Sequence, residues 1–460
     1  MSRLLVATIL ASGFGPPFLF SGVAVALPTL GRELDASAVE LGLVETVYLA
    51  GSLAFLLPAG RLADATDKNA LYKAGLAAFA LTSLLIALTS WMPGLLVLRF
   101  VQGAAGALYG TTSIAILAEL VGPGRRGRVF GMTLGVAYAG LTLGPILAGI
   151  LVESIGWRSV FVAGAAVTWL GWAGTLGRLP SRWRSPGDAV HVGSTILVVV
   201  ATLALVAGSA TMQTPVVGLA FVGVGIAIGA VFVRSQRRLP RPLVDVAALV
   251  QNAPLRSALL VQMLLYMNAF CSTFLLSLYL QVVRDRSASD AGEILAVGSV
   301  VMAALAPFAG AFGDRIGAAR VAAAGVVMVT VAAALGTQLG TTTPTAVVLV
   351  QTTLQGLGFA LFSSPNMARI MDSVPAAQVG MASALGAKSR SLGMVTGMLT
   401  TAALVAVHVG SARVEERPDE LLDVVRVAFV VLSCAGVAAF VAGALGGRGG
   451  GRGGGDASAR

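Results

Sequence analysis

Charged residues are scarce in this sequence of 460 residues. Asp, Glu, Lys and Arg make up only 11% of it, whereas ordinary soluble domains contain roughly 25% of these residues. Hydrophobic residues account for 56%, and the mean hydropathy is +0.87. This composition argues against a water-soluble fold and predicts an integral membrane protein.

Cysteine and histidine are also rare, which argues against several kinds of site. The two cysteines, Cys271 and Cys434, stand in separate apolar runs, and the two histidines, His191 and His408, are isolated. This spacing provides neither a disulfide framework nor a set of metal ligands. The sequence also lacks the Gly-Lys-Ser/Thr of an ATP-binding loop and any catalytic cluster at one membrane face. We therefore expect no metal, no cofactor and no enzymatic activity.

Long runs without charged residues fill most of the chain. A bilayer core about 30 Å thick needs about 20 apolar residues for each helical crossing. Six runs precede a basic stretch at 178–188, two share the stretch 189–233, which the polar segment 211–215 divides, and six more follow. The twelve outer runs lie near 4–30, 41–60, 74–91, 95–118, 129–152, 159–177, 257–283, 294–313, 321–338, 345–368, 391–410 and 427–446. We predict an all-α membrane protein with fourteen transmembrane helices.

The basic residues lie mostly between the apolar runs. If the amino terminus is cytoplasmic, most Lys and Arg residues fall in cytoplasmic segments, as the positive-inside rule requires. We therefore assign the net charge of +10 to membrane orientation and expect no nucleic-acid partner. The predicted location is the cell membrane, crossed many times, with both termini cytoplasmic. Residues 447–460, rich in Gly and Arg, are predicted to form a disordered tail.

The sequence also contains an internal repeat. Residues 60–75 resemble residues 310–325, with Asp64 and Asp314 in the same relative place. Further matched positions are Gln102-Gly103 with Gln355-Gly356, and Gly127, Gly140 and Gly144 with Gly380, Gly393 and Gly397. Two parallel halves that enclose a pathway are typical of transporters. We predict pseudo-symmetric six-helix bundles at 1–178 and 257–446, joined by a linker at 179–256 that contains two inserted transmembrane helices.

These motifs resemble those of the major facilitator superfamily. The repeated loops are similar to its signature of a glycine, an aspartate four residues later and then basic residues, although Ala65 and Asp67 depart from it in the first copy. The segment 98–103, with Arg99, resembles the span-four motif, and 140–149 resembles the span-five motif that marks exporters in the family. The fourteen predicted spans and the sequence at 26–30 resemble those of the fourteen-span drug:proton antiporters. However, Leu19 stands where the family usually has an aspartate.

The repeat and the resemblance together imply a secondary active transporter. We expect it to export hydrophobic or cationic small molecules, as in multidrug efflux, by proton antiport with alternating access. Its expected partners are the small-molecule substrate, protons and the lipid bilayer, and we expect a monomer. The alternative is a lipid or glycolipid exporter of the same superfamily.

Two ionisable residues inside the predicted spans are candidates for proton coupling. Glu45 lies in the outer part of span two and Arg99 in the outer part of span four, at similar predicted depth. Embedded charges are costly and usually functional, and we expect these two to pair. Protonation of Glu45 would then release Arg99. The alternative for Glu45 is a solvated, structural position at the interface.

Two larger sets of residues are predicted to form the conformational gate and the substrate cavity. The aspartates of the gate would each cap a helix or bind an arginine in one conformation only, while its glycines and proline would permit close packing and a bend. The gate candidates are Asp64, Asp314, Arg315, Glu119, Arg125, Arg128, Gly140, Gly144, Pro145 and Gly149. The cavity candidates are polar or aromatic residues within the spans, each of which could equally serve in helix packing. They are Phe18, Phe20, Tyr48, Gln102, Tyr109, Gln262, Tyr266, Asn268 and Asn366.

Overall fold

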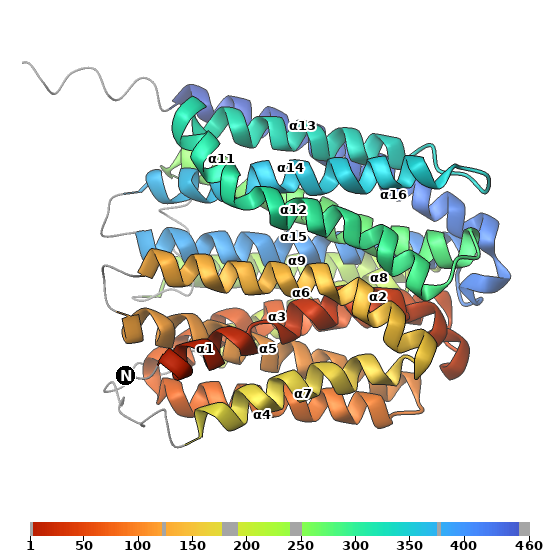
Figure 1. The fold of residues 1–460 in the computed structure, drawn as a ribbon, viewed down its shortest axis with the longest axis horizontal. Coiled ribbons are helices and arrows are strands. Elements are labelled where there is room, and N and C mark those ends of the chain that lie inside the picture. Colours follow the sequence, from red (N-terminus) through yellow and green to blue (C-terminus); the bar gives the residue numbers. More distant parts are fainter. Residues whose placement is uncertain (1–2, 122–125, 177–191, 240–250, 375–378, 450–460) are drawn as a thin grey trace, which may run out of the picture. The chain divides into compact units, whose positions relative to one another are not determined.

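The computed structural model describes residues 3–121, 126–176, 192–239, 251–374 and 379–449 (Figure 1). All regular secondary structure in these ranges is helical. Thirteen helices within them are long and apolar enough to cross a membrane. The chain is therefore an all-helical protein built to pass through a bilayer many times.

Seven helices lie in the described residues before the predicted linker. They are α1 (Arg3–Ser12), α2 (Gly15–Leu34), α3 (Ala38–Ala65), α4 (Lys68–Leu88), α5 (Met92–Val121), α6 (Arg126–Ser154) and α7 (Arg158–Thr175). The first two make up one candidate span, with a break at Gly13 and Phe14 directly before two prolines. The short α7 begins with a charged residue and is not among the thirteen candidates. The count of fourteen crossings thus stays a prediction.

The remaining helices include the two inserted ones. They are α8 (Val192–Ala210), α9 (Pro215–Gln236), α11 (Ala253–Leu278) with a π-helical turn η2 (Tyr279–Val283), α12 (Ala288–Ile316), α13 (Ala318–Gly336), α14 (Thr345–Asp372), α15 (Val379–His408), the 3-10 turn η4 (Val414–Glu416) and α16 (Pro418–Gly449). The candidate span in α15 starts at Leu385, earlier than the predicted start at 391. The difference arises because charge-free runs define the prediction, whereas this helix carries Lys388 and Arg390 into the span.

Polar residues at the helix starts fix where the helices begin. At α3 the Ser37 side chain accepts a hydrogen bond from the Glu40 backbone, while the Glu40 carboxylate accepts one from the Ser37 backbone. Asp67 caps α4 by accepting from the backbone of Asn69 and Ala70. Such caps satisfy backbone donors that the first helical turn leaves open, which matters most at the edge of a membrane.

The chain forms two compact units. Unit 1 consists of Met1–Phe232, Ser277–Ala296 and Ala402–Leu421, and unit 2 of Val233–Leu276, Val297–Thr401 and Leu422–Arg460. Unit 1 therefore contains two short segments from the second half of the sequence. The domain boundaries predicted from the sequence stay a prediction.

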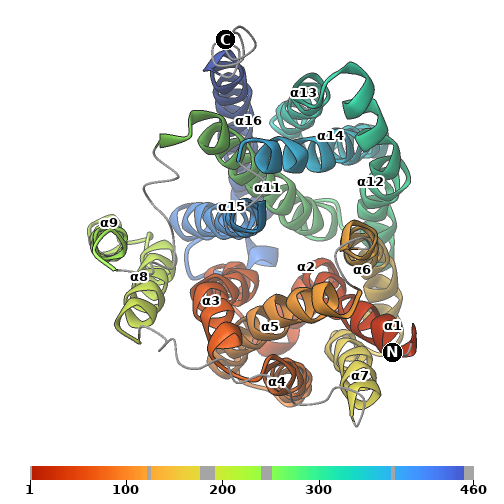
Figure 2. The ribbon, with the colours of Figure 1, turned by 90° about the vertical axis from the view of Figure 1, so that its left-hand side faces the viewer.

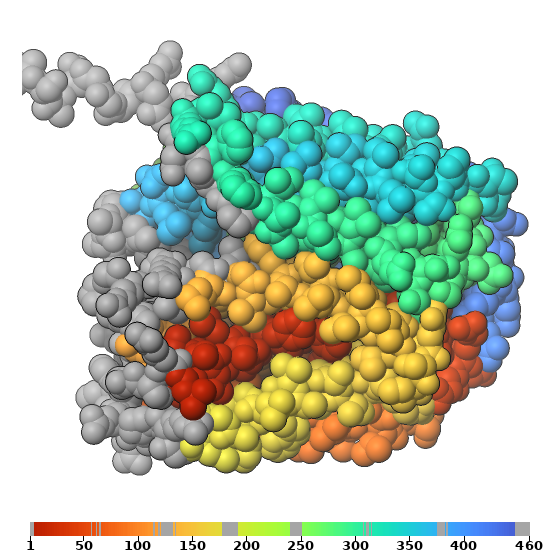
Figure 3. All heavy atoms as spheres, in the orientation of Figure 1, coloured from red at the N-terminus to blue at the C-terminus, as the bar shows by residue number. Residues whose placement is uncertain are grey.

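Within unit 1, α3 packs against α5 and α8, and α4 packs against α5 and α7. Figure 2 shows α8 beside α3, with α9 on the far side of α8. In Figure 3 the atoms of α1, in red, lie between those of α6 and α7. Helix α9 is the least buried of the thirteen candidate spans, and large apolar side chains such as Val216 and Ile226 are exposed. This face is suited to contact with lipid.

The same glycine contact occurs once in each unit. In unit 1, a Cβ atom on Gly75 of α4 would lie 2.8 Å from the backbone nitrogen of Tyr109 in α5. In unit 2, a Cβ atom on Gly325 of α13 would lie 2.8 Å from the backbone nitrogen of Phe362 in α14. Both pairs occupy matched positions of the sequence repeat, so the repeat extends to helix packing.

A second glycine contact recurs in the same way. A Cβ atom on Gly144 of α6 would lie 2.9 Å from the Phe18 carbonyl oxygen of α2. A Cβ atom on Gly397 of α15 would lie 3.0 Å from the Met267 carbonyl oxygen of α11. Gly144 and Gly397 are matched positions of the sequence repeat, and each packs against a carbonyl oxygen of the first predicted span of its half. Only glycine lets the two backbones approach this closely.

Candidate functional site

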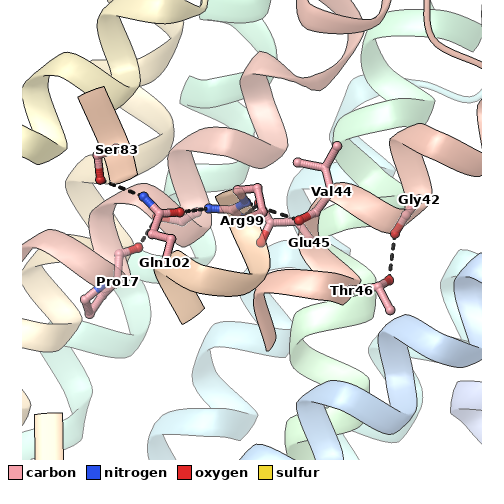
Figure 4. Close-up of polar contacts among 9 residues, drawn as sticks. Pro17, Gly42, Val44, Glu45, Thr46, Ser83, Arg99 and Gln102 are labelled. Carbon is pink, nitrogen blue, oxygen red and sulfur yellow. Dashed lines mark hydrogen bonds and ion pairs between the residues drawn. The ribbon is translucent and has the colours of Figure 1, made fainter. Parts of the chain in front are cut away.

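Arg99 of α5 and Glu45 of α3 form an ion pair in the interior of unit 1. Their side chains are 0% and 1% exposed, and the Arg99 Nη2 atom lies 2.8 Å from the Glu45 Oε1 atom (Figure 4). The structure therefore brings together the two ionisable residues that the sequence places at similar depth, and it places Glu45 away from solvent. Their role in proton coupling stays a prediction.

Arg99 makes two further polar contacts, which extend the network across three helices. Its Nε atom donates to the Val44 carbonyl oxygen at 3.1 Å, and its Nη1 atom donates to the Gln102 side-chain oxygen at 2.7 Å. Gln102 in turn donates to the Ser83 hydroxyl of α4 at 2.6 Å (Figure 4). Helices α3, α5 and α4 are thus linked by one continuous chain of polar side chains.

Aromatic rings enclose the guanidinium group. The Arg99 Cζ atom lies 4.4 Å from the ring centroid of Tyr48 and 5.8 Å from that of Phe161. Both rings are buried, so they exclude water while their faces stabilise the cation. The aromatic contacts explain how an arginine can be retained deep inside an apolar bundle.

Among the described residues, Arg99 is the one cation that pairs with Glu45. Neither of its carboxylate oxygens accepts a hydrogen bond of good geometry from any residue in the described ranges. Burial of an ionised carboxylate without partners is strongly unfavourable, whereas a close ion pair offsets part of this cost. The protonation state of Glu45 and the position of Arg99 are therefore linked.

Glycine allows the two charged helices to approach each other. A Cβ atom on Gly103 of α5 would collide with the Tyr48 carbonyl oxygen of α3, and one on Gly51 of α3 would collide with the Phe100 carbonyl oxygen of α5. The two glycines place the backbones in direct contact. As a result, the side chains of Glu45 and Arg99 meet without a gap.

All nine predicted cavity residues are buried within the structure, at 8% exposure or less. In unit 1, Tyr109 packs against Tyr72 and Phe79, and its hydroxyl has no hydrogen-bond partner among the described residues. In unit 2, Asn268 donates to the Leu432 carbonyl oxygen at 3.1 Å. Tyr109 and Asn268 thus contact neighbouring helices, and the cavity role of the nine residues stays a prediction.

Comparison with known proteins identifies the family. A family model described as Major Facilitator Superfamily matches residues 9–189 and 258–449. This chain belongs to the major facilitator superfamily. The superfamily match stops on both sides of the segment that contains α8 and α9. The chain is therefore a multi-pass membrane transporter rather than an enzyme, and the predicted family is confirmed.

Several relatives within this superfamily are efflux proteins. The multidrug resistance protein Stp of Mycobacterium tuberculosis is 28% identical over 96% of this chain and 84% of its own length. The tetracenomycin C resistance and export protein of Streptomyces glaucescens is 26% identical over 84% of this chain and 73% of its own length. A solved POT family transporter in complex with 5-aminolevulinic acid shares the fold, with a TM-score of 0.74 and 13% identity over 96% of each chain.

The exporter-like motif of α6 has two packing faces in this superfamily member. Gly140 and Gly144 lie against α2. Gly149 lies against Ser289, where a Cβ atom would be 2.8 Å from the Ser289 Cα atom, and the Pro145 carbonyl oxygen lies directly against Gly292. Helix α6 therefore joins α2 to the first turns of α12 within unit 1, which places the motif at a contact between the two sequence halves.

Further contacts within unit 1 join the sequence halves from the middle of α2 toward the end where α2 stops and α3 starts, here called the α2–α3 end. The Ser277 hydroxyl donates to the Ala24 carbonyl oxygen at 2.6 Å, and the Gln281 side chain donates to the Val25 carbonyl oxygen at 3.1 Å. The Glu153 carboxylate accepts from the Ser289 backbone at 2.9 Å.

Helix α3 also contacts the second half of the sequence at the α2–α3 end. Together these contacts are called the closure at this end. The Ala38 backbone donates to the Ala412 carbonyl oxygen at 2.8 Å, and Asp35 pairs with Arg413. The sequence did not single out Ser277 or Gln281, because their partners are backbone carbonyls that carry no sequence signal. Arg413 was missed because its partner Asp35 lies in the other half of the sequence.

Among the predicted gate residues with charged side chains, the structure describes the side chain of Arg315 alone. The side chains of Asp64, Asp314, Glu119, Arg125 and Arg128 lie outside the described residues. Arg315, at the end of α12, is exposed. The predicted gate at the opposite end from the α2–α3 closure thus stays a prediction.

Proposed function

We propose that this transporter exports hydrophobic or cationic small molecules in exchange for protons. The observation that carries the proposal is the buried pair of Glu45 and Arg99. Among the described residues, the Arg99 guanidinium group alone compensates the charge of the Glu45 carboxylate. The names of the relatives Stp and the tetracenomycin C exporter support drug-like cargo. None of the relatives described above is named for lipid export, so the lipid alternative has less support.

Protonation of Glu45 would neutralise the carboxylate and remove its attraction to Arg99. Gly42, one helical turn before Glu45, packs against Ala402 from the second half of the sequence. Ala38, one turn earlier still, makes the backbone contact with Ala412. A proton bound at Glu45 is therefore placed to loosen or tighten the closure at the α2–α3 end, because the same helix carries both.

The proposed cycle is alternating access between two six-helix bundles, residues 1–178 and 257–446. The recurring glycine contacts of the two units support this internal symmetry. With fourteen crossings and both termini in the cytoplasm of the cell, the α2–α3 end faces outward. The inserted pair α8 and α9 lies beside α3 as an addition to the first bundle. The transporter acts as a monomer in this scheme.

The test uses purified protein in proteoliposomes with ethidium as a hydrophobic cation. Wild-type protein should accumulate ethidium when a proton gradient is imposed. Glu45→Gln should lose this accumulation but retain counterflow, the exchange of labelled for unlabelled ethidium, because counterflow needs no net proton movement. Arg99→Ala should impair both. Glu416→Gln is the matched control, since Glu416 is exposed. Unchanged gradient-driven transport in both Glu45→Gln and Arg99→Ala would refute the coupling role.

A further inference from the structure

Helix α15 carries two basic residues inside its candidate membrane span, Lys388 and Arg390. Both are partly buried. At a rise of 1.5 Å per residue, Arg390 lies about 8 Å beyond Leu385, the first residue of the candidate span. Ionisable residues inside membrane spans are costly and usually mark a functional site.

Arg390 belongs to a junction of three helices in unit 2. On α11, Gln262 donates to the Gly386 carbonyl oxygen of α15 at 2.6 Å and accepts from Asn366 of α14 at 3.3 Å. One turn further along α11 and α15, Tyr266 meets Arg390, whose Cζ atom lies 5.7 Å from the ring centroid. The polar contact and the cation–aromatic contact are thus successive layers of one junction.

The same junction provides an aromatic wall. Tyr266 packs edge-on against Phe359 of α14, with ring centroids 4.8 Å apart, and stacks on Phe270 of its own helix at 6.0 Å. An arginine that lies over a ring uses the face of its guanidinium group and keeps the N–H donors along the edge available. This geometry combines an apolar surface with a directional cationic donor.

The described residues supply no anion to this site. No ion pair or hydrogen bond among them includes the Arg390 guanidinium group. The acidic side chains described in unit 2 lie toward helix ends, with Asp372 at the last residue of α14 and Asp423 in the second turn of α16. The buried Asn366 side-chain oxygen also lacks a hydrogen-bond partner among the described residues. The junction therefore contains a guanidinium group and an amide oxygen for which the described residues provide no hydrogen-bond partner.

We propose that Arg390 binds the acid group of an aromatic carboxylate substrate, whose ring packs against Tyr266 and its neighbours. The proposal rests on the transport function proposed above and adds an anionic substrate class to it. Arginine suits this role because its planar fork forms two parallel hydrogen bonds with a carboxylate. The shared chemistry is an anionic group with an apolar body, which an anionic lipid also carries, so the test separates the two sources.

The test compares naphthoate with its uncharged isostere naphthamide. The full-length protein is placed in nanodiscs of phosphatidylcholine, and binding is measured by calorimetry. Wild-type protein should bind naphthoate about tenfold more tightly than naphthamide, a typical gain for a charge-assisted bidentate contact. Arg390→Gln should remove this preference, and Arg390→Lys should retain part of it.

Lys388→Gln is the matched control, since it removes the same charge two residues away, about 200° around the helix. It should leave the naphthoate preference intact. Equal losses in Arg390→Gln and Lys388→Gln would overturn the proposal, because a general positive potential would then explain binding. Loss of the preference in nanodiscs that contain phosphatidylglycerol would also overturn it and assign the site to lipid.

Ethidium transport in the same variants keeps the two proposals apart. Wild-type protein and the control Lys388→Gln should both show the naphthoate preference and both export ethidium. If wild-type protein shows no naphthoate preference but exports ethidium in response to protons, the substrate inference fails and the transport function stands. If the naphthoate preference is present and no proton-driven export occurs, the transport function fails and the anion site stands.

Discussion

Gly103 of α5 lies directly against the backbone carbonyl of Tyr48 in α3. This contact sets the distance between the helices that carry Glu45 and Arg99.

Gly103→Ala should destabilise the transporter and weaken the ion pair, because a Cβ atom has no room at this position. Overpacking of this kind costs about 1–3 kcal/mol, which should appear as a lower apparent melting temperature in detergent. Gly110→Ala, seven residues later in the same helix, is the control, since a Cβ atom there meets nothing within 4 Å. It should be neutral or slightly stabilising. Equal stability of the two variants would contradict the packing argument.

Arg99→Gln should destabilise the protein more than the loss of one contact suggests. The change leaves the Glu45 carboxylate buried without compensation, at a cost of about 3–5 kcal/mol. The double variant Glu45→Gln/Arg99→Gln should recover much of this stability, because no buried charge remains. Thermal unfolding of the two single variants and the double variant measures the coupling. Additive effects would show that the two charges do not depend on each other.

Gly75→Ala and Gly325→Ala should both lower the melting temperature. Each Cβ atom would press against a backbone nitrogen at 2.8 Å, Tyr109 in one unit and Phe362 in the other. The effect should be at least as large for Gly325→Ala, because its Cβ atom would also lie 2.4 Å from the Gly358 carbonyl oxygen. The comparison tests the internal repeat directly, since the two sites are matched in sequence. A large effect at one site and none at the other would argue against equivalent packing in the two halves.

Ser277→Ala with Gln281→Leu should loosen the closure at the α2–α3 end. The changes remove side-chain donors to the carbonyl oxygens of Ala24 and Val25. A cysteine placed at Val25, which is fully buried, reports opening through its rate of labelling by a water-soluble maleimide applied from outside. The background carries Cys434→Ser, because Cys434 is exposed.

Labelling should be several-fold faster in the variant than in the parent. Ser433→Ala is the control, since the Ser433 hydroxyl donates within its own helix, to Phe429. Equal labelling rates in the variant and the parent would show that Ser277 and Gln281 do not stabilise the closure.

Much of this molecule could be predicted from its sequence because charge is so unevenly distributed along it. Apolar runs gave the positions of most helices, and matched glycines predicted contacts that recur in both units. The pairing of Glu45 with Arg99 followed from their similar depth. The roles of these residues stay predictions.

Other features depend on three-dimensional partners that a single sequence does not reveal. Charge-free runs start the predicted span in α15 at 391, whereas the candidate span starts at Leu385 and includes Arg390, which lies beside an aromatic ring on another helix. The donors at the α2–α3 end were missed because their acceptors are backbone atoms some 250 residues away. For the same reason, the sequence could not show which of the buried amides serve helix packing.

Helix α9 exposes large apolar side chains, and α8, on which it packs, lies beside α3. Lipid tails that press on α9 therefore act through α8 on α3, the helix that bears the Glu45 carboxylate. The acyl-chain length and thickness of the surrounding bilayer therefore have a direct mechanical route to the proposed proton site. We expect exchange kinetics in this transporter to respond to membrane composition as well as to cargo.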